Sequence, residues 1–110
     1  MAREQLKTLT ESMYYILLTL LKPQHGYGIM QEVDHLTKGR VKVGAGTLYN
    51  LLSRFEEEEI ITQVVEENRK KVYLISEKGL AILRAEHQRL NQLVDDGNLL
   101  LKEGRWPNET

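Results

Sequence analysis

The sequence contains no cysteine among its 110 residues. Disulfide bonds and thiolate metal sites are therefore excluded, and the absence fits a reducing compartment. Long apolar runs are also lacking, because the stretch 14–21 is too short to cross a bilayer and is followed by Lys22 and Pro23. No secretory signal pattern precedes this stretch. We therefore expect a soluble cytoplasmic protein that spans no membrane.

A large net charge is missing too, since the formal value is −1 at pH 7. The charges are nevertheless grouped: residues 38–42 hold three cations and no acid, residues 69–71 are Arg-Lys-Lys, and residues 56–59 are all glutamate. A nearly neutral total can thus accompany one basic face. The 41% hydrophobic and 28% charged residues are typical of one globular domain and not of a disordered chain.

Apolar residues at three- and four-residue steps predict a first helix between Leu6 and Leu21. Thr8 and Glu11 form a plausible capping box at its start, and Pro23 follows its end. A turn with two glycines at 25–28 then leads into a second, short helix.

The segment 44–59 predicts a third helix, opened by glycines and finished by the four glutamates. Its inward face is expected to comprise Ala45, Leu48, Leu51, Leu52 and Phe55. Two segments rich in β-branched residues, 60–66 and 71–75, flank a polar break and predict a hairpin. Ser76 is placed to cap a last helix.

The last helix carries an apolar seam with alternating steps of three and four residues, about three heptads long. Its members are Leu80, Leu83, His87, Leu90, Val94, Gly97 and Leu101. One short domain cannot easily cover so long a stripe, so a second copy of the chain is the economical cover. The alternative is that this helix folds back on its own domain.

Three short helices, a hairpin and a long helix in this order are typical of a winged helix-turn-helix. The predicted fold class is mainly α (α+β), with a two-stranded wing and a long C-terminal dimerisation helix. We divide the chain into a DNA-binding domain at 1–75 and a dimerisation helix with its tail at 76–110. In this architecture the third helix enters a major groove and the wing reaches a neighbouring phosphate or the minor groove.

Hydrogen-bonding side chains are expected on the outward face of the third helix, where they can meet bases or phosphates. They are Thr47, Tyr49, Asn50, Ser53 and Arg54. The wing tip adds the cations Arg69, Lys70 and Lys71, and Lys42 is a weaker candidate for phosphate contact. Any soluble helix exposes polar residues, so the prediction rests on the set as a whole.

Three motifs together resemble the PadR family of bacterial winged-helix regulators. They are His-Gly-Tyr at 25–27, Gly-Thr-Leu-Tyr at 46–49, and Arg-Lys-Lys-Val-Tyr at 69–73 followed by Ser76 and Gly79. The resemblance implies a homodimer formed through the last helix that represses a nearby operon at a palindromic operator. It also implies release by a small hydrophobic or phenolic effector in some members.

The sequence departs from the multidrug-sensing members of that family in its aromatic residues. Those members carry a tryptophan on the last helix, where this chain has Leu90, while its only tryptophan is Trp106. An aromatic drug sandwich is therefore not expected here.

Two other function classes compete with DNA binding. An enzyme is disfavoured because the three histidines are dispersed and no nucleophile–base order or phosphate-binding loop is visible. For the same reason we expect no metal site and no cofactor. A winged-helix module that docks proteins through its third helix remains the alternative, and the near-neutral charge favours it.

Overall fold

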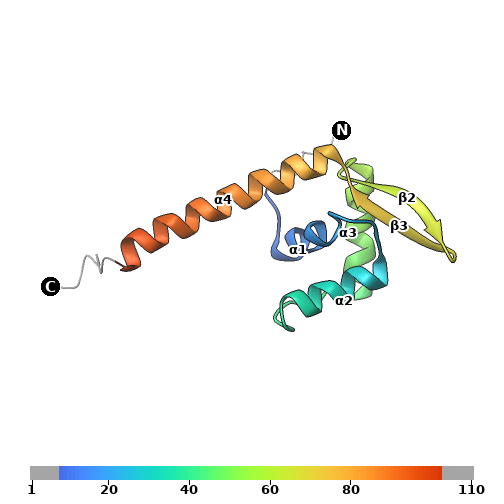
Figure 1. Cartoon of the computed structure of the whole chain (residues 1–110), viewed down its shortest axis with the longest axis horizontal. Coiled ribbons are helices and arrows are strands. Elements are labelled where there is room, and N and C mark those ends of the chain that lie inside the picture. The colour runs from blue at the N-terminus through green and yellow to red at the C-terminus, as the bar shows by residue number, and fades with distance from the viewer. Residues whose placement is uncertain (1–7, 103–110) are drawn as a thin grey trace.

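The computed structural model describes residues 8–102, without the side chains of residues 65–67. The predicted helix position Leu6, Trp106 and the ends of both predicted domains lie outside the described residues. The elements are α1 (Glu11–Thr19), β1 (Gln24–His25), α2 (Gly26–Leu36), α3 (Ala45–Glu57), β2 (Ile61–Glu67), β3 (Lys70–Ile75) and α4 (Glu77–Lys102). Figure 1 shows α1, α2 and α3 gathered together, with α4 leaving them in one direction and the β2–β3 hairpin in another.

The hairpin is confirmed, but it belongs to a three-stranded antiparallel sheet with strand order β1-β3-β2. Gln24 pairs with Tyr73 and His25 with Val72. The expected two-stranded wing therefore gains a short third strand from residues that the sequence placed in a turn. This strand joins the start of α2 to the base of the wing. At the other end of the hairpin, Asn68 and Arg69 have φ values of 51° and 65°, which suit a tight two-residue turn.

The helix starts differ from the predictions in three details. The predicted cap Thr8 is wrong, because the N-cap of α1 is Thr10, whose side chain accepts a hydrogen bond from the Met13 amide. The turn at 25–28 is instead a helix start, in which His25 Nδ1 accepts from the Gly28 amide at 3.2 Å. Ala45, expected to face inward, is exposed at the first turn of α3.

The core lies where α1, α2 and α3 meet the sheet. Its fully buried side chains include Ile16, Leu17, Leu20, Ile29, Val33, Leu48, Phe55 and Ile60. The inward face predicted for α3 is thus confirmed at Leu48, Leu52 and Phe55. Because one side of α3 is buried in this core, its opposite side is held outward on a rigid support.

The last helix is covered only over its first part. Leu83 is buried against the core, whereas Val94 is 58% exposed and Leu101 is 61% exposed. The helix therefore follows both alternatives in part, because its start packs on its own domain and its far end does not. Within residues 8–102, nothing covers the apolar side chains of that far end.

A buried carboxylate connects α4 to the segment before α1. Glu86 is only 2% exposed, and it accepts hydrogen bonds from the Leu9 amide at 3.1 Å and from two nitrogens of Arg89 at 2.7 and 2.8 Å. The bonds from Arg89 lower the pKa of Glu86 against the opposing effect of burial. The charge is thus compensated, as a buried carboxylate requires.

The start of α4 is clamped against the end of α3. The Ser76 hydroxyl lies 2.7 Å from the Glu59 carbonyl oxygen and 2.8 Å from that of Ile60, and its oxygen accepts from the Gly79 amide at 3.0 Å. The predicted cap at Ser76 is therefore confirmed. A Cβ on Gly79 would collide with the Ile60 carbonyl oxygen and would lie 2.8 Å from Ile75 Cγ1. Only glycine fits this crossing.

We predict that Gly79→Ala lowers the free energy of unfolding by about 1–3 kcal/mol, the usual cost of overpacking a tight contact. Urea denaturation of the purified protein measures this change. The matched control is Gly46→Ala, in the first turn of α3, where an added Cβ meets nothing within 4 Å. The control should be neutral or more stable by up to about 1 kcal/mol, as helix propensity favours alanine. Equal stability of the two variants would contradict the clamp.

Candidate nucleic-acid interface

The outward face of α3 carries the polar side chains that the sequence assigned to it. Thr47, Asn50 and Ser53 are exposed, on the side opposite to the buried positions of the helix. Their three-residue spacing places them in one row along the helix surface. The row is therefore presented to solvent by the packing of the core, with hydroxyl and amide groups that can donate and accept hydrogen bonds.

The start of α3 is open. Gly44 is its N-cap and forms no side-chain cap hydrogen bond. A Cβ at Gly44 or Gly46 would meet nothing within 4 Å. The backbone amides of this first turn can therefore be approached closely by an anion, which the helix dipole favours.

Two predicted contact residues are engaged within the protein. Arg54 Nε lies 2.8 Å from the Glu58 carboxylate, one turn further along α3, and Lys42 Nζ lies 3.8 Å from the Asp34 carboxylate. Lys42 remains well exposed in this loose pair. Arg54 is the more constrained of the two, because its guanidinium group is held along the helix.

The wing cations occupy the tip and the adjoining strand. Arg69 lies in the turn, Lys70 and Lys71 begin β3, and all three side chains are exposed. The sequence predicted this grouping, because three consecutive cations without an acid fall at the break between the two predicted strands.

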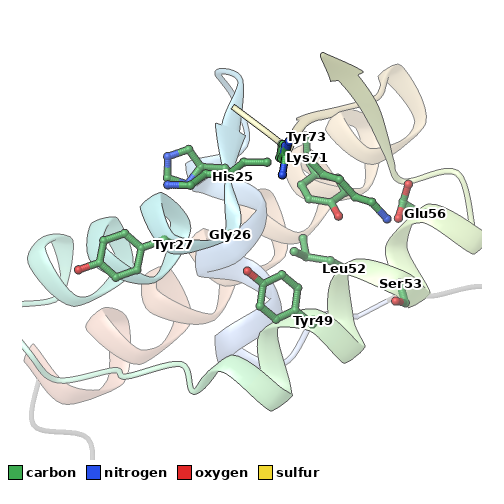
Figure 2. Close-up of a pocket in the computed structure, with 11 residues that line it drawn as sticks. His25, Gly26, Tyr27, Tyr49, Leu52, Ser53, Glu56, Lys71 and Tyr73 are labelled. Carbon is green, nitrogen blue, oxygen red and sulfur yellow. The ribbon is translucent and has the colours of Figure 1, made fainter. Parts of the chain in front are cut away.

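A groove of about 460 Å³ separates α3 from the wing, and the start of α2 closes its third side. Figure 2 shows Tyr49 of α3 and Tyr73 of the wing turned toward it, with Gly26 of α2 beside them. The groove is lined by His25, Gly26, Tyr27, Tyr49, Leu52, Ser53, Glu56, Arg69, Lys70, Lys71 and Tyr73. It therefore joins the polar row of α3 to the cations of the wing in one continuous surface.

Tyr49 lies across this groove and reaches the start of α2. Its side chain is 50% exposed, and Figure 2 shows its hydroxyl turned toward Gly26. A Cβ on Gly26 would collide with that hydroxyl and would lie 2.9 Å from the ring carbon that bears it. Gly26 thus leaves the space that Tyr49 occupies, a role that the sequence did not reveal.

Glu56 and Tyr73 are also members of the groove that the sequence missed. Glu56, the first of the four consecutive glutamates, lines the groove beside the wing. Tyr73 is only 4% exposed, and burial, followed by Glu56 and Tyr49, raises its pKa. Strand alternation placed Tyr73 in the sheet but did not indicate what its hydroxyl faces.

The start of α4 and the end of α1 form a second, more apolar groove of about 290 Å³. Its lining comprises Tyr14, Leu18, Leu21, Leu80, Leu83, Arg84 and His87. Three of these residues belong to the seam predicted for dimerisation. The remaining seam residues continue from this groove along α4, where Leu90 and Gly97 are half-buried and Val94 and Leu101 are exposed.

Two further sites were searched for among the described residues. No three histidine, aspartate or glutamate side chains between residues 8 and 102 converge as a metal-binding group. None of the described helices combines the length and the apolar character that membrane crossing requires.

Known proteins resemble this chain in both sequence and structure. The model of the transcriptional regulator PadR-like family matches residues 16–85. The transcriptional regulator YqjI of Escherichia coli is 28% identical over 69 residues, which cover 63% of this chain and 33% of that protein. The uncharacterized protein X of Lysinibacillus sphaericus is 33% identical over 70 residues, 60% of this chain and 64% of that protein. The chain therefore spans less than two thirds of the length of these relatives.

Solved structures share the fold. A transcriptional regulator of Clostridium thermocellum superposes with a TM-score of 0.68 at 22% identity, covering 80% of this chain and 91% of the other. A PadR-like regulator of Bacillus cereus gives 0.68 at 25% identity, with 80% and 88% covered. The winged-helix DNA-binding protein F93 of STIV gives 0.61 at 24% identity, with 74% and 89% covered. The fold is accordingly a winged helix.

Proposed function

This chain belongs to the transcriptional regulator PadR-like family, and from this premise we propose that it is a repressor that binds a palindromic operator as a homodimer. It is a transcriptional regulator with a winged-helix DNA-binding fold. The proposed operator binding rests on one observation, the continuous surface formed by the exposed row of α3 and the cationic wing. In the proposal, residues 1–75 bind DNA and residues 76–110 hold two copies together in the cytoplasm, without catalysis.

The row on α3 supplies the sequence-reading contacts of the proposal. A major groove admits an α-helix, and a carboxamide such as that of Asn50 can form two hydrogen bonds with an adenine edge. Thr47 and Ser53 flank Asn50 in the same exposed row and reach neighbouring bases or phosphates. The open first turn of the helix favours a phosphate at its N-terminus.

The wing supplies contacts that do not depend on base sequence. Arg69 in the hairpin turn and Lys70 and Lys71 at the start of β3 are exposed and bear three positive charges. Each phosphate that such a cation neutralises releases condensed counterions, so affinity falls steeply with salt. Lys42 adds a weaker contact, since it shares its charge with Asp34 at 3.8 Å.

The apolar surface of α4 supports the homodimer. Within the described residues, the seam runs from the α1–α4 groove to the exposed side chains of Val94 and Leu101. Monomeric proteins rarely leave a long apolar stripe in water, and a second copy offers the same stripe in a two-fold arrangement. Two α3 helices about 34–36 Å apart would then match half-sites one helical turn apart.

For some members of the family, the resemblance implies release by a small hydrophobic or phenolic compound. The α1–α4 groove offers Tyr14, Leu18 and Leu21 as its apolar wall. Leu90 is half-buried where multidrug-sensing relatives carry tryptophan, so a ligand stacked between two tryptophans is not part of the proposal.

A protein-docking module is the second candidate function. Two observations favour it, the net charge of −1 and the position of Glu56 within the groove beside the wing. The salt dependence of duplex binding separates the two candidates, because a protein-docking module has no phosphates to neutralise.

We predict that the triple variant Arg69→Ala, Lys70→Ala, Lys71→Ala binds all duplexes more weakly and has a flatter salt dependence. The slope of log affinity against log salt should fall by about 0.9 for each phosphate that the variant no longer neutralises. Fluorescence anisotropy with a labelled duplex at several salt concentrations measures the slope. Lys102→Ala, at the far end of α4, should leave it unchanged. An unaltered slope in the triple variant would remove the wing from the interface.

We predict that Asn50→Ala relaxes base preference at one position of each half-site. The loss at that position should be about 1–3 kcal/mol, the discrimination of one good bidentate contact. Binding-site selection from random duplexes, followed by affinity measurements on single-base variants, tests this. The control Gln92→Ala removes an exposed carboxamide from α4 and should keep the wild-type preference. If both variants select the same sequence logo, Asn50 reads no base.

We predict that Val94→Glu produces monomers, because it places a charge within the proposed interface at a position that is 58% exposed in the single chain. Sedimentation velocity should show halved mass, and affinity for a palindromic duplex should fall with it. Gln92→Glu adds the same charge on the opposite side of α4 and should stay dimeric. A Val94→Glu protein that still sediments as a dimer would place the interface elsewhere.

A further inference from the structure

The Tyr73 side chain is largely buried, with an exposed fraction of 4%, and its hydroxyl makes no hydrogen bond within the described residues. No side-chain oxygen or nitrogen of those residues is sealed from solvent without a partner, so this hydroxyl is open to the groove that Tyr73 lines. Figure 2 shows the ring reaching into that groove between α3 and the wing. Because the hydroxyl is accessible at the base of an open groove and makes no hydrogen bond within the described residues, it is free to donate one to a bound ligand.

A second phenol faces the same groove. Tyr49 projects from α3, and its hydroxyl end packs over Gly26 at the first residue of α2. Gly26 and Tyr27 both line the groove, so the positive end of the α2 dipole also faces it. Two hydroxyl donors and one helix N-terminus therefore converge from three different elements.

The charges around the groove favour an anion. Arg69, Lys70 and Lys71 stand along one side and Glu56 along another, so the lining carries a net positive charge. Glu56 is the one acid of this lining, and together with burial it raises the pKa of Tyr73. Like an ordinary tyrosine, this phenol is protonated at neutral pH, and it can donate a hydrogen bond.

We propose that this groove seats one backbone phosphate of the bound duplex, with the Tyr73 and Tyr49 hydroxyls donating hydrogen bonds to its oxygens. The seat rests on the proposed DNA binding and adds Tyr73 to the residues that touch the ligand. Gly26 is a positioning residue, because its missing side chain leaves the room in which Tyr49 lies. The wing cations then contact the neighbouring phosphates of the same strand, on either side of this phosphate.

The experiment tests whether the Tyr73 hydroxyl contacts one particular phosphate of the duplex. The duplex recovered by wild-type selection is prepared with single methylphosphonate linkages at successive positions, each of which removes one phosphate charge. With the wild-type protein, we expect linkages opposite the wing cations and at the seat to weaken binding, the seat linkage by about ten-fold, as removing a hydrogen bond to a charged group does. Tyr73→Phe should weaken binding to the unmodified duplex to a similar extent and should be indifferent to that linkage. Tyr15→Phe, outside the groove, is the matched control and should behave as wild type.

The outcomes separate this inference from the function on which it rests. If the wild-type protein recovers no duplex at all, DNA binding fails and the seat fails with it. If the wild-type protein binds but Tyr73→Phe shows unchanged affinity, or the same linkage penalty as wild type, only the phosphate seat is overturned. Inorganic phosphate and chloride are compared as competitors at equal ionic strength, and stronger competition by phosphate that Tyr73→Phe abolishes would support the seat, because free phosphate and the duplex would then share it.

A second pair of variants tests the positioning role without touching either phenol. Gly26→Ala places a methyl group in the space of Tyr49 and should weaken duplex binding about ten-fold, with the penalty at the sensitive linkage reduced, because one hydrogen bond to a charged group is weakened. Gly28→Ala, two residues further along α2, meets only the flexible end of Gln24 as its nearest neighbour and should bind as wild type. Equal affinity of the two variants at unchanged fold, checked by circular dichroism, would overturn the role of Gly26.

Discussion

The architecture depends on one close contact, in which the backbone of Gly79 lies against the carbonyl of Ile60. At this point α3 has just ended, β2 begins, β3 ends and α4 starts. Ser76 completes the contact through its hydroxyl, which bonds the Glu59 and Ile60 carbonyls and caps α4. The positive φ of Glu59, 61°, turns the chain out of α3 into the wing. Because four elements share this junction, it sets the directions of the wing and of the last helix together.

A second constraint holds the other side of α4. Glu86 binds the Leu9 amide and Arg89 from a position that is 2% exposed, and Leu83 packs into the core one turn earlier. The start of α4 is thereby fixed to the globular part of the molecule, and its far end leaves that part uncovered (Figure 1). A helix held in this way would fix the position of the proposed partner subunit relative to the proposed DNA-binding surface.

The proposed interface was recognisable from sequence in its parts. Helical periodicity placed Leu48, Leu52 and Phe55 inside and hence Asn50 outside, and this was confirmed. Turn chemistry placed Arg69 at the tip of the hairpin, also as observed. Both predictions succeed because they depend on residues close together in the chain, where backbone geometry alone decides which way a side chain points.

The groove could not be predicted in the same way, because it brings Gly26, Tyr49 and Tyr73 together from α2, α3 and β3, and no local pattern relates positions so far apart. The third strand could not be predicted for the same reason, because β1 forms a strand through its pairing with β3.

Local sequence patterns thus suffice to predict the winged-helix order of elements, the inward and outward faces of α3, and an apolar stripe on α4 that extends beyond the reach of one domain. Each follows from the periodicity of apolar residues and from turn-forming residues, which act over a few positions. Three further features come from the packed fold: which part of the stripe is covered, the burial of Glu86, and the Tyr73 hydroxyl that faces a groove without a partner in the described chain. These features depend on packing between distant segments, and no local stretch of sequence shows which distant residues will pack against it.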